Sequence, residues 1–289
     1  MLKLSYNSGA KFRECQKKYY WRYIKGYKPI LRAIALGLGS IIHDAFDHFY
    51  KGMLDQQVHL YIADQFNKII SQQEATDQED WLIAKYTALG MWDYYPRKLD
   101  KFEVISTEEE FEIPLDVDIS FIGKVDGRIK QKGIWWVREL KTTSQNYRQF
   151  QGKCQTSMQG TGYVYGLLPN YDIKGIMYDY IKKPILRKGM SETADDFGRR
   201  IMRDYRNRPR YYYQRYPSYR NPVDIKNFAK DTMTLAYDIQ DKISSGNFYR
   251  NQDQCWHWGK ECEYAKICFQ EQPDPLTVEL YYEKGGTYV

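Results

Sequence analysis

Runs of β-branched and aromatic residues in the middle of the chain predict strands. Residues 119–130 and 134–142 form two such runs, and the short break Gln131-Lys132-Gly133 separates them. Two runs of this kind joined by a short glycine-containing break are typical of a β-hairpin. Residues 102–113 and 173–182 have the same strand character. We therefore expect a sheet built around a central hairpin.

Apolar residues at helical spacing predict helices on both sides of this hairpin. Ile42, Ala45, Phe46 and Phe49 recur three or four residues apart behind Ser40, a residue type that often begins helices. Helical patterns also cover residues 58–99, with a polar interruption at 71–80, and residues 155–167 and 223–245. Strands combined with helices in this order predict an α/β (α+β) fold, in which helices flank a mixed β-sheet core.

The same pattern divides the 289 residues into three regions: an N-terminal helical region at 1–101, a strand-rich core at 102–184 and a C-terminal helical region at 185–289. Hydrophobic residues make up 43% of the chain and charged residues 28%, as in folded soluble proteins. No run approaches the roughly 20 apolar residues of a membrane span, and the first residues lack the apolar core of a secretory signal. We therefore expect a cytoplasmic protein without membrane contact.

Charged residues of the hairpin are the first candidates for chemistry. Glu139 and Lys141 alternate with Leu140, so they share one face of their strand, and Asp126 on the preceding strand can stand opposite them. Two carboxylates and an amine are the groups that metal-dependent phosphodiester hydrolysis needs, because carboxylate oxygens hold Mg²⁺ or Mn²⁺. The same residue types also occur on solvated hairpin edges, so the spacing alone leaves both interpretations open.

Two helices carry further polar pairs. His43 and Asp47 lie four residues apart beside the apolar stripe of their helix, and Gln159 and Tyr163 are spaced in the same way. A histidine next to an apolar stripe is usually structural. A ligand role for His43 therefore needs support from other residues.

The segment at 204–222 mixes arginine and tyrosine. It contains Arg206, Arg208, Arg210, Tyr213 and Arg215. Arginine matches phosphates and tyrosine rings stack on unpaired bases, so the segment suits a track for single-stranded nucleic acid. A loop whose tyrosines pack under a neighbouring helix explains the composition equally well. The net charge of +6 permits a polyanionic partner without requiring one.

Three cysteines, Cys255, Cys262 and Cys268, fall within fourteen residues near the C-terminus. Without an export signal such a group indicates metal ligation rather than disulfides. The spacing is not that of a standard zinc finger, which favours an iron–sulfur cluster over zinc. Both need a fourth ligand, for which Cys15, Cys154 and His257 compete, and three buried unliganded cysteines are the remaining alternative.

Taken together and in order, these motifs resemble a known family. The motifs are Phe-x-x-Cys-x-x-Lys-Tyr around Cys15, Gly-x(3)-His ending at His43, Gly-x-x-Asp ending at Asp126, Glu139-x-Lys141, Gln159-x(3)-Tyr163 and the cysteine trio. This set resembles the RecB-type branch of the PD-(D/E)xK nuclease superfamily, and more closely the stand-alone iron–sulfur exonucleases of phages and CRISPR adaptation loci. The chain departs from the pattern at Asp47, where the family often has glutamate, and in its wider cysteine spacing.

The resemblance implies a restriction-endonuclease-like core at 102–184 and assigns roles within it. Mg²⁺ or Mn²⁺ would be held by His43, Asp126, Glu139 and the carbonyl of Leu140. Lys141 would be the motif lysine, and Gln159 and Tyr163 would position substrate. A [4Fe–4S] cluster, or zinc as the alternative, would join the two ends of the chain through Cys15, Cys255, Cys262 and Cys268. Tyr213-Gln214-Arg215 resembles an aromatic-x-Arg element of some phage members.

The implied function is a metal-dependent DNA exonuclease acting on single strands or duplex ends. In phage-type recombination or repair its partner would be a recombinase or annealing protein. The alternative is a CRISPR adaptation nuclease that trims prespacer ends beside an integrase, and an alternative of another class is a non-catalytic nucleic-acid-binding protein. The implied location is the cytoplasm of a bacterial, archaeal or phage-infected cell. A helicase-coupled nuclease is less expected for this chain, because it lacks a Gly-x(4)-Gly-Lys-Ser/Thr phosphate loop.

Overall fold

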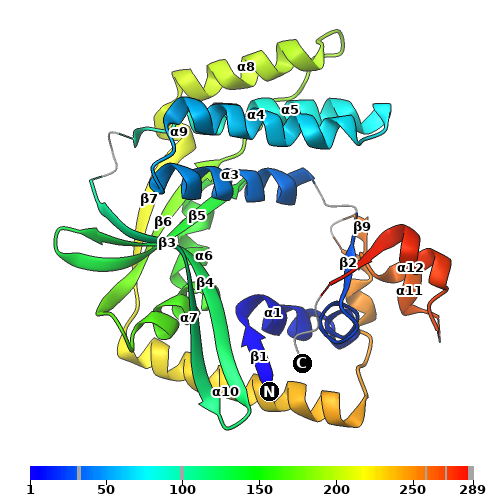
Figure 1. The fold of residues 1–289 in the computed structure, drawn as a ribbon. Helices are drawn as coiled ribbons and strands as arrows, with labels where there is room; N and C mark the ends of the chain where they lie inside the picture. The colour runs from blue at the N-terminus through cyan, green and yellow to red at the C-terminus, as the bar shows by residue number, and fades with distance from the viewer. Residues whose placement is uncertain (31–33, 98–100, 258, 271, 286–289) are drawn as a thin grey trace. The chain divides into compact units, whose positions relative to one another are not determined.

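The computed structural model describes the chain except residues 31–33, 98–100, 258, 271 and 286–289, so the end of the helical pattern predicted at 58–99 lies outside the described residues. The chain folds into two compact units, each built from segments that are far apart in the sequence (Figure 1). The terminal unit comprises Met1–Arg32, Glu110–Gly123 and Asn221–Val289, and the central unit comprises Ala33–Glu109 and Lys124–Arg220. The three regions predicted from the sequence are continuous stretches of the chain, whereas each of the two units combines segments that are distant in the sequence.

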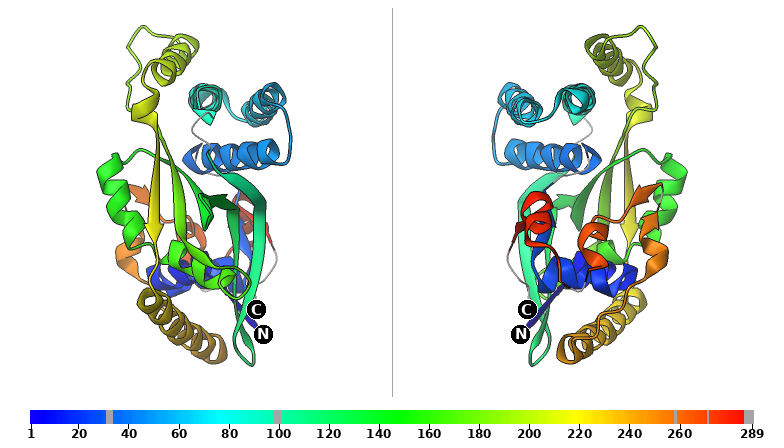
Figure 2. Two further views of the ribbon diagram at one scale, coloured as in Figure 1. Left: turned by 90° about the vertical axis from the view of Figure 1, so that its left-hand side faces the viewer. Right: turned by 90° about the vertical axis from the view of Figure 1, so that its right-hand side faces the viewer.

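The central unit is a mixed sheet with helices on both faces (Figure 2). β4 pairs antiparallel with β5, β5 pairs parallel with β6, and β6 pairs antiparallel with β7, while β3 pairs with β4. The strands are β3 (Glu103–Asp116), β4 (Ile119–Gln131), β5 (Ile134–Thr143), β6 (Ile173–Lys182) and β7 (Tyr213–Tyr219), and the parts of β3 and β4 within Glu110–Gly123 belong to the terminal unit. The helices are α3 (Ile34–Tyr50), α4 (Asp55–Ser71), α5 (Ala75–Asp93), α6 (Tyr147–Gln155), α7 (Met158–Leu167), α8 (Ala194–Asn207) and α9 (Pro209–Tyr212). The predicted α/β fold with a mixed sheet and flanking helices is confirmed.

The β4–β5 hairpin turns on two residues in the left-handed region. Lys132 has φ 50° and Gly133 has φ 79°, and Gln131 pairs with Ile134 on either side of them. Two successive positive φ angles match the right-handed twist of the strands that they join. The short glycine-containing break in the sequence is therefore the turn itself.

Helices α3, α4, α5 and α8 cover one face of the sheet (Figure 1). Their apolar stripes bury Phe46, Ile62, Trp92 and Ile201 in one core together with Leu140 from the sheet. Burying a large apolar side chain contributes about 1.5–3 kcal/mol, so these helices anchor the face that Leu140 occupies. The neighbouring residues of β5, Glu139 and Lys141, consequently emerge on the opposite face.

The start of α3 corrects the prediction that Ser40 begins this helix. α3 starts at Ile34, so Ser40 lies inside it. The apolar stripe extends back to Leu38, which is 4% exposed, and burial therefore continues the helix beyond the polar residue. Gly37 is needed at this contact, because a Cβ there would lie 2.8 Å from the ring of Trp81.

The terminal unit combines short strands with helices from both ends of the chain. β1 pairs parallel with the first residues of β4, and β2 pairs antiparallel with β10. Leu4, Phe12, Tyr19, Ala236 and Ile239 share one core. Its elements are β1 (Leu2–Ser5), α1 (Tyr6–Glu14), α2 (Gln16–Tyr19), the π-helical η1 (Tyr20–Ile24), β2 (Tyr27–Pro29), α10 (Pro222–Ser245), the 3₁₀ turn η3 (Gln252–Gln254), β8 (Trp256–His257), β9 (Lys260–Glu261), α11 (Ala265–Cys268), α12 (Pro275–Tyr281) and β10 (Tyr282–Lys284). Across the described residues, no helix has the length and apolar character that crossing a membrane requires.

Candidate active site

Asp126 links β4 to two other elements of the central unit. Its Oδ1 lies 3.1 Å from Nδ1 of His43 on α3, and its Oδ2 accepts a hydrogen bond from the backbone N–H of Leu140 on β5 at 2.7 Å. The three residues are 83 and 14 positions apart in the sequence. The structure therefore brings the predicted histidine, aspartate and Leu140 together.

Glu139 is buried beside them. Its side chain is 3% exposed, Oε1 lies 2.5 Å from Nζ of Lys141, and Oε2 is buried without a hydrogen-bond partner among the described residues. Burial, followed by the charge of Asp126, raises the pKa of Glu139 to about 7. A buried carboxylate oxygen without a partner is costly, so this atom marks a position where a cation or a donor is expected.

Neighbouring charges also shift the pKa values of the residues around Glu139. Burial opposes ionisation of Asp126, but the charge and hydrogen bond of His43 outweigh it, so the pKa of Asp126 falls below its usual range. Burial likewise opposes the charged forms of His43 and Lys141, yet the carboxylates raise the pKa of both. The ammonium of Lys141 is therefore charged at neutral pH.

Helix α7 extends the site through two hydrogen bonds. Nζ of Lys141 donates to Oε1 of Gln159 at 3.0 Å, and Nε2 of Gln159 donates to the hydroxyl of Tyr163 at 2.8 Å. Ser157 caps the helix by accepting from the N–H of Gly160. The predicted pair Gln159 and Tyr163 thus lies on one face of α7 and reaches the motif lysine.

Arg220 fixes the junction of α6 and α7, which sequence reasoning missed. Its five N–H groups donate to Thr161 Oγ1, Ser218 Oγ and the carbonyls of Tyr219, Cys154 and Ser157, at 2.7 to 3.4 Å. The side chain is buried, with 8% of the residue exposed. Arginine also occurs throughout the neighbouring segment, so no local pattern separated this residue from the others.

A second unpredicted feature is an ionic triad inside the sheet. Asp179 on β6 accepts from Nε of Arg138 at 2.6 Å and from Nε of Arg215 at 2.5 Å, and its side chain is 2% exposed. The guanidinium of Arg138 also stacks over the rings of Phe46 and Tyr50. The triad joins β5, β6 and β7 one residue away from Glu139. A single aspartate between the apolar and aromatic residues at 176–178 and 180–181 was the available signal.

The arginine- and tyrosine-rich segment does not form one open track. Tyr213 is buried and its hydroxyl donates to the carbonyls of Gly90 and Met91, while Arg215 is held by Asp179. Arg208 pairs with Asp204. Tyr213 and Arg215 thus pack within the central unit, in agreement with the alternative of tyrosines under a helix, whereas Arg206 and Arg210 are exposed and their DNA-binding role stays a prediction.

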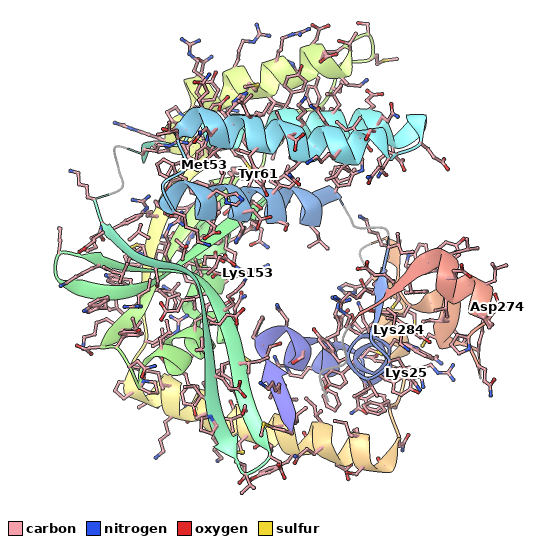
Figure 3. The ribbon with its side chains drawn as sticks, in the orientation of Figure 1. Lys25, Met53, Tyr61, Lys153, Asp274 and Lys284 are labelled. Atoms are coloured by element: carbon pink, nitrogen blue, oxygen red, sulfur yellow. The ribbon has the colours of Figure 1, made fainter. Side chains whose placement is uncertain are left out.

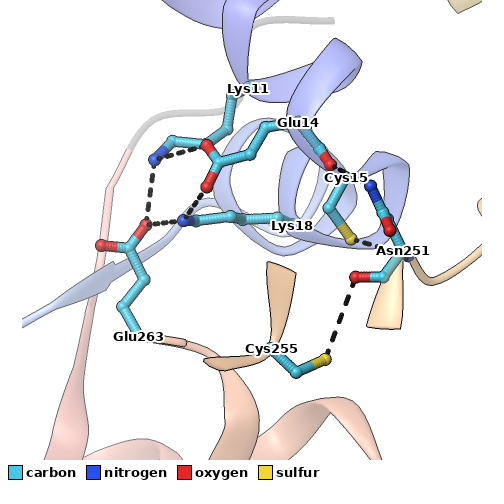
Figure 4. A network of polar contacts seen from close by, with 7 residues as sticks. All are labelled: Lys11, Glu14, Cys15, Lys18, Asn251, Cys255 and Glu263. Carbon is cyan, nitrogen blue, oxygen red and sulfur yellow. Dashed lines mark hydrogen bonds and ion pairs between the residues drawn. The ribbon is translucent and has the colours of Figure 1, made fainter. Parts of the chain in front are cut away.

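Four cysteines of the terminal unit line one pocket. Cys15, Cys255, Cys262 and Cys268 surround it, and neither Cys154 nor His257 is among its lining residues. The backbone N–H of Asn251 donates to Sγ of Cys15 at 3.3 Å (Figure 4). Burial raises the pKa of both Cys262 and Cys268. The two ends of the chain therefore contribute thiols to the same place.

A network of charges borders this pocket. Lys18, which also lines it, lies 2.7 Å from Glu14 and 3.6 Å from Glu263, and Lys11 bridges the same two carboxylates (Figure 4). Arg250 lines the pocket as well. Two cations therefore adjoin the four thiols.

Neither place is a complete metal site as it stands. Within the described residues, no group of three or more His, Cys, Asp and Glu side chains is arranged so that it could hold a metal ion. In the candidate catalytic group, which we define as His43, Asp126, Glu139 and Lys141, His43 contacts Asp126 and Glu139 contacts Lys141 instead. In each contact a carboxylate is paired with a group that can carry a proton. A bound cation would take the place of that group beside the carboxylate, because metal binding and proton release are linked.

Comparison with known proteins identifies the family of the chain. Among curated proteins, none matches the chain. The family model described as PD-(D/E)XK nuclease superfamily matches residues 3–269. This range includes strands β3 to β7, the candidate catalytic group and all four pocket cysteines. A match over this much of the chain establishes the family: the chain belongs to the PD-(D/E)XK nuclease superfamily.

Proposed function

We propose that the chain is a metal-dependent DNA exonuclease that acts on single strands or duplex ends in phage-type recombination or repair. Family membership implies a nuclease with a nucleic-acid substrate, and nucleases of this superfamily generally use divalent cations such as Mg²⁺. The observation that carries the proposal is the buried Oε2 of Glu139 beside Asp126 and Lys141, which has no hydrogen-bond partner among the described residues.

The donor set fits a hard divalent cation. Asp126 and Glu139 offer carboxylate oxygens, which Mg²⁺ and Mn²⁺ prefer, and His43 and the Leu140 carbonyl would complete the set. A cation bound there would polarise the phosphate and lower the pKa of a water molecule. The raised pKa of Glu139 is consistent with this use, because a carboxyl that resists ionisation in the protein alone ionises readily next to a cation.

The remaining residues supply charge and alignment. Lys141 is fixed between Glu139 and Gln159, so its ammonium has a defined position beside the carboxylates. A fixed positive charge offsets the negative charge that develops on a phosphate during hydrolysis, without the cost of reorganisation. Gln159 keeps the lysine in place, and Tyr163 in turn orients Gln159.

Digestion of labelled oligonucleotides tests this function. Single- and double-stranded DNA labelled at the 5′ or the 3′ end is incubated with Mg²⁺, Mn²⁺ or a chelator. We expect stepwise shortening from an end with metal and none with chelator. Internal cuts would contradict the exonuclease assignment, and metal-independent binding without any cleavage would support a non-catalytic binding protein instead. Asp172→Asn removes an exposed carboxylate of the central unit and serves as the matched control.

We further propose that Cys15, Cys255, Cys262 and Cys268 hold a [4Fe–4S] cluster. Four thiols around one pocket are the donor set of such a cluster, and the N–H···S bond to Cys15 together with Lys18 and Arg250 would offset its negative charge. The group would tie the N-terminal helices to the C-terminal segment and so stabilise the terminal unit. Iron and sulfide analysis of anaerobically purified protein tests the assignment. Colourless protein that contains stoichiometric zinc would show that the four cysteines form a zinc site instead of holding a cluster.

A further inference from the structure

A pocket adjoins the motif lysine on the sheet face that carries the proposed catalytic group. It is lined by the end of β5, by α6, by the start of α7 and by β6. The lining residues are Lys141, Thr142, Thr143, Gln145, Phe150, Lys153, Cys154, Ser157 and Tyr178. We propose that this Lys153 pocket binds a phosphate group of the substrate strand next to the one that is hydrolysed. The inference rests on the proposed nuclease function.

The charge of the pocket suits an anion. It contains two lysines, and neither aspartate nor glutamate is among its lining residues. Lys141 is compensated by Glu139, whereas no hydrogen bond or ion pair connects the ammonium of Lys153 to any other described residue. Burial raises the pKa of the Cys154 thiol to about 12, so this residue adds no negative charge at neutral pH. Lys153, on α6 and labelled in Figure 3, therefore supplies an uncompensated positive charge.

Hydroxyl and amide groups complete the chemistry. Thr142, Thr143 and Gln145 are half-buried at the wall that follows Lys141. Oγ1 of Thr143 already accepts the N–H of Gln145 at 3.1 Å, so its own proton remains for donation. Lysine with neutral donors is a usual combination for phosphate oxygens.

Both walls of the pocket are held from behind. On one side, Nζ of Lys182 donates to the carbonyls of Ser144 and Gln145 at 3.3 and 3.1 Å, and the hydroxyl of Tyr180 donates to the Gln145 carbonyl at 2.5 Å. On the other side, Arg220 donates to the Cys154 carbonyl at 2.8 Å. A wall that is already ordered loses little entropy on binding, so the pocket is preorganised for a ligand.

Position decides which phosphate the pocket takes. Lys141 belongs both to the catalytic group and to the pocket lining. A DNA strand whose reacting phosphate lies at Lys141 therefore places a neighbouring phosphate within reach of Lys153. That neighbour is either an internal phosphodiester or, at the end of a strand, a terminal phosphate.

Kinetics of Lys153→Gln test the proposal. We expect KM for a single-stranded oligonucleotide to rise about 10-fold with kcat nearly unchanged, and the salt dependence of binding to lose about one unit of slope. Lys153→Arg should restore both. Lys174→Gln, which removes an exposed lysine outside the pocket at the start of β6, should change neither. Unaltered KM and slope in Lys153→Gln, or equal losses in Lys174→Gln, would overturn the proposal.

Modified substrates identify the source of the phosphate. A neutral methylphosphonate next to the reacting linkage should weaken binding to the wild-type protein and add nothing to the loss in Lys153→Gln. If removal of the terminal phosphate has this effect instead, the pocket takes strand ends. If both proteins respond equally to every modification, the pocket binds no phosphate.

Equilibrium binding of the same oligonucleotides with chelator present separates the two proposals. Wild-type protein that binds with chelator but does not cleave when Mg²⁺ or Mn²⁺ is added would refute the nuclease function, while the slope of Lys153→Gln would still decide on the pocket. Wild-type protein that cleaves, together with an unchanged Lys153→Gln, would refute the pocket alone.

Discussion

Nζ of Lys141 lies 3.0 Å from Oε1 of Gln159, so a helix holds the motif lysine of a strand in place. Gln159→Ala removes this support while leaving every proposed metal ligand intact. We expect kcat to fall about 10- to 100-fold, as is usual when a residue behind a reacting group is lost, with a smaller change in KM. Gln155→Ala, on the exposed side of α6, is the control. Equal activity of Gln159→Ala and wild type would show that Lys141 is positioned by Glu139 alone.

Removal of either carboxylate should separate binding from cleavage. Asp126→Asn and Glu139→Gln keep the size of each side chain but remove an anionic oxygen donor. We expect cleavage to fall by more than about 100-fold, while DNA binding with chelator stays within a few-fold of wild type. Gel-based digestion and fluorescence anisotropy measure the two quantities. Retained cleavage in either variant would contradict the assigned metal ligands.

Asp179 should make stability depend on pH. Burial opposes its ionisation, but Arg138 and Arg215 outweigh this and hold the pKa below its usual range. The ionised Asp179 therefore stabilises the fold above the unfolded-state pKa of about 4. This stabilisation is lost as the pH falls towards the lower folded-state pKa. Asp179→Asn should unfold more easily at pH 7, by about 3–5 kcal/mol, as expected when a buried ion pair loses one partner.

The difference between wild type and Asp179→Asn should shrink below about pH 4. Urea unfolding at several pH values measures it. Asp172→Asn, in which an exposed surface pair is lost, should cost at most about 1 kcal/mol at any pH. A pH-independent difference between wild type and Asp179→Asn would show that the effect comes from packing rather than from the charge.

One cysteine of the four-cysteine pocket and one cysteine outside it offer a matched pair of substitutions. Cys262→Ser should abolish the visible absorption of the proposed cluster and lower the unfolding temperature, because the bound group stabilises the fold. Cys154→Ser changes a buried cysteine of the central unit and should keep both the colour and the iron content. Absorption spectra and iron analysis of anaerobic samples decide between the outcomes. Equal iron loss in both variants would contradict the assignment of the four ligands.

Two helical glycines should respond oppositely to alanine. A Cβ on Gly198 in α8 would lie 2.1 Å from the ring of Tyr86, so Gly198→Ala should destabilise the protein by about 1–3 kcal/mol. A Cβ on Gly152 in α6 would meet nothing within 4 Å, so Gly152→Ala should stabilise by about 0.5–1 kcal/mol. Thermal unfolding measures both. Similar effects at the two positions would show that Tyr86 moves aside freely.

Local patterns made part of the site predictable. The β4–β5 hairpin, the shared face of Glu139 and Lys141, and the spacing of Gln159 and Tyr163 all follow from periodicity over a few residues. The helix predicted at 155–167 begins at Met158 in the structure, because Ser157 caps α7, and the preceding helix α6 was not predicted. Serine caps are visible in a sequence, but they compete with the continuing helical pattern.

Long-range contacts were beyond local patterns. The proximity of His43 and Asp126 was expected only from the family resemblance, because nothing in the residues between them specifies it. The same holds for the triad around Asp179, whose partners lie 41 and 36 residues away. The burial of Tyr213 depends on α5, whose position only the folded chain defines.

Arg220 shows how a position without a motif can constrain the chain as strictly as the motifs do. A guanidinium has five N–H donors, and all five have acceptors here. Lysine, with three donors, would lose two of these hydrogen bonds, and no other side chain carries enough donors. Substitution tolerance around the reaction centre is therefore set in part by the geometry of one helix junction, and two members of a family with identical motifs can differ in activity through this residue alone.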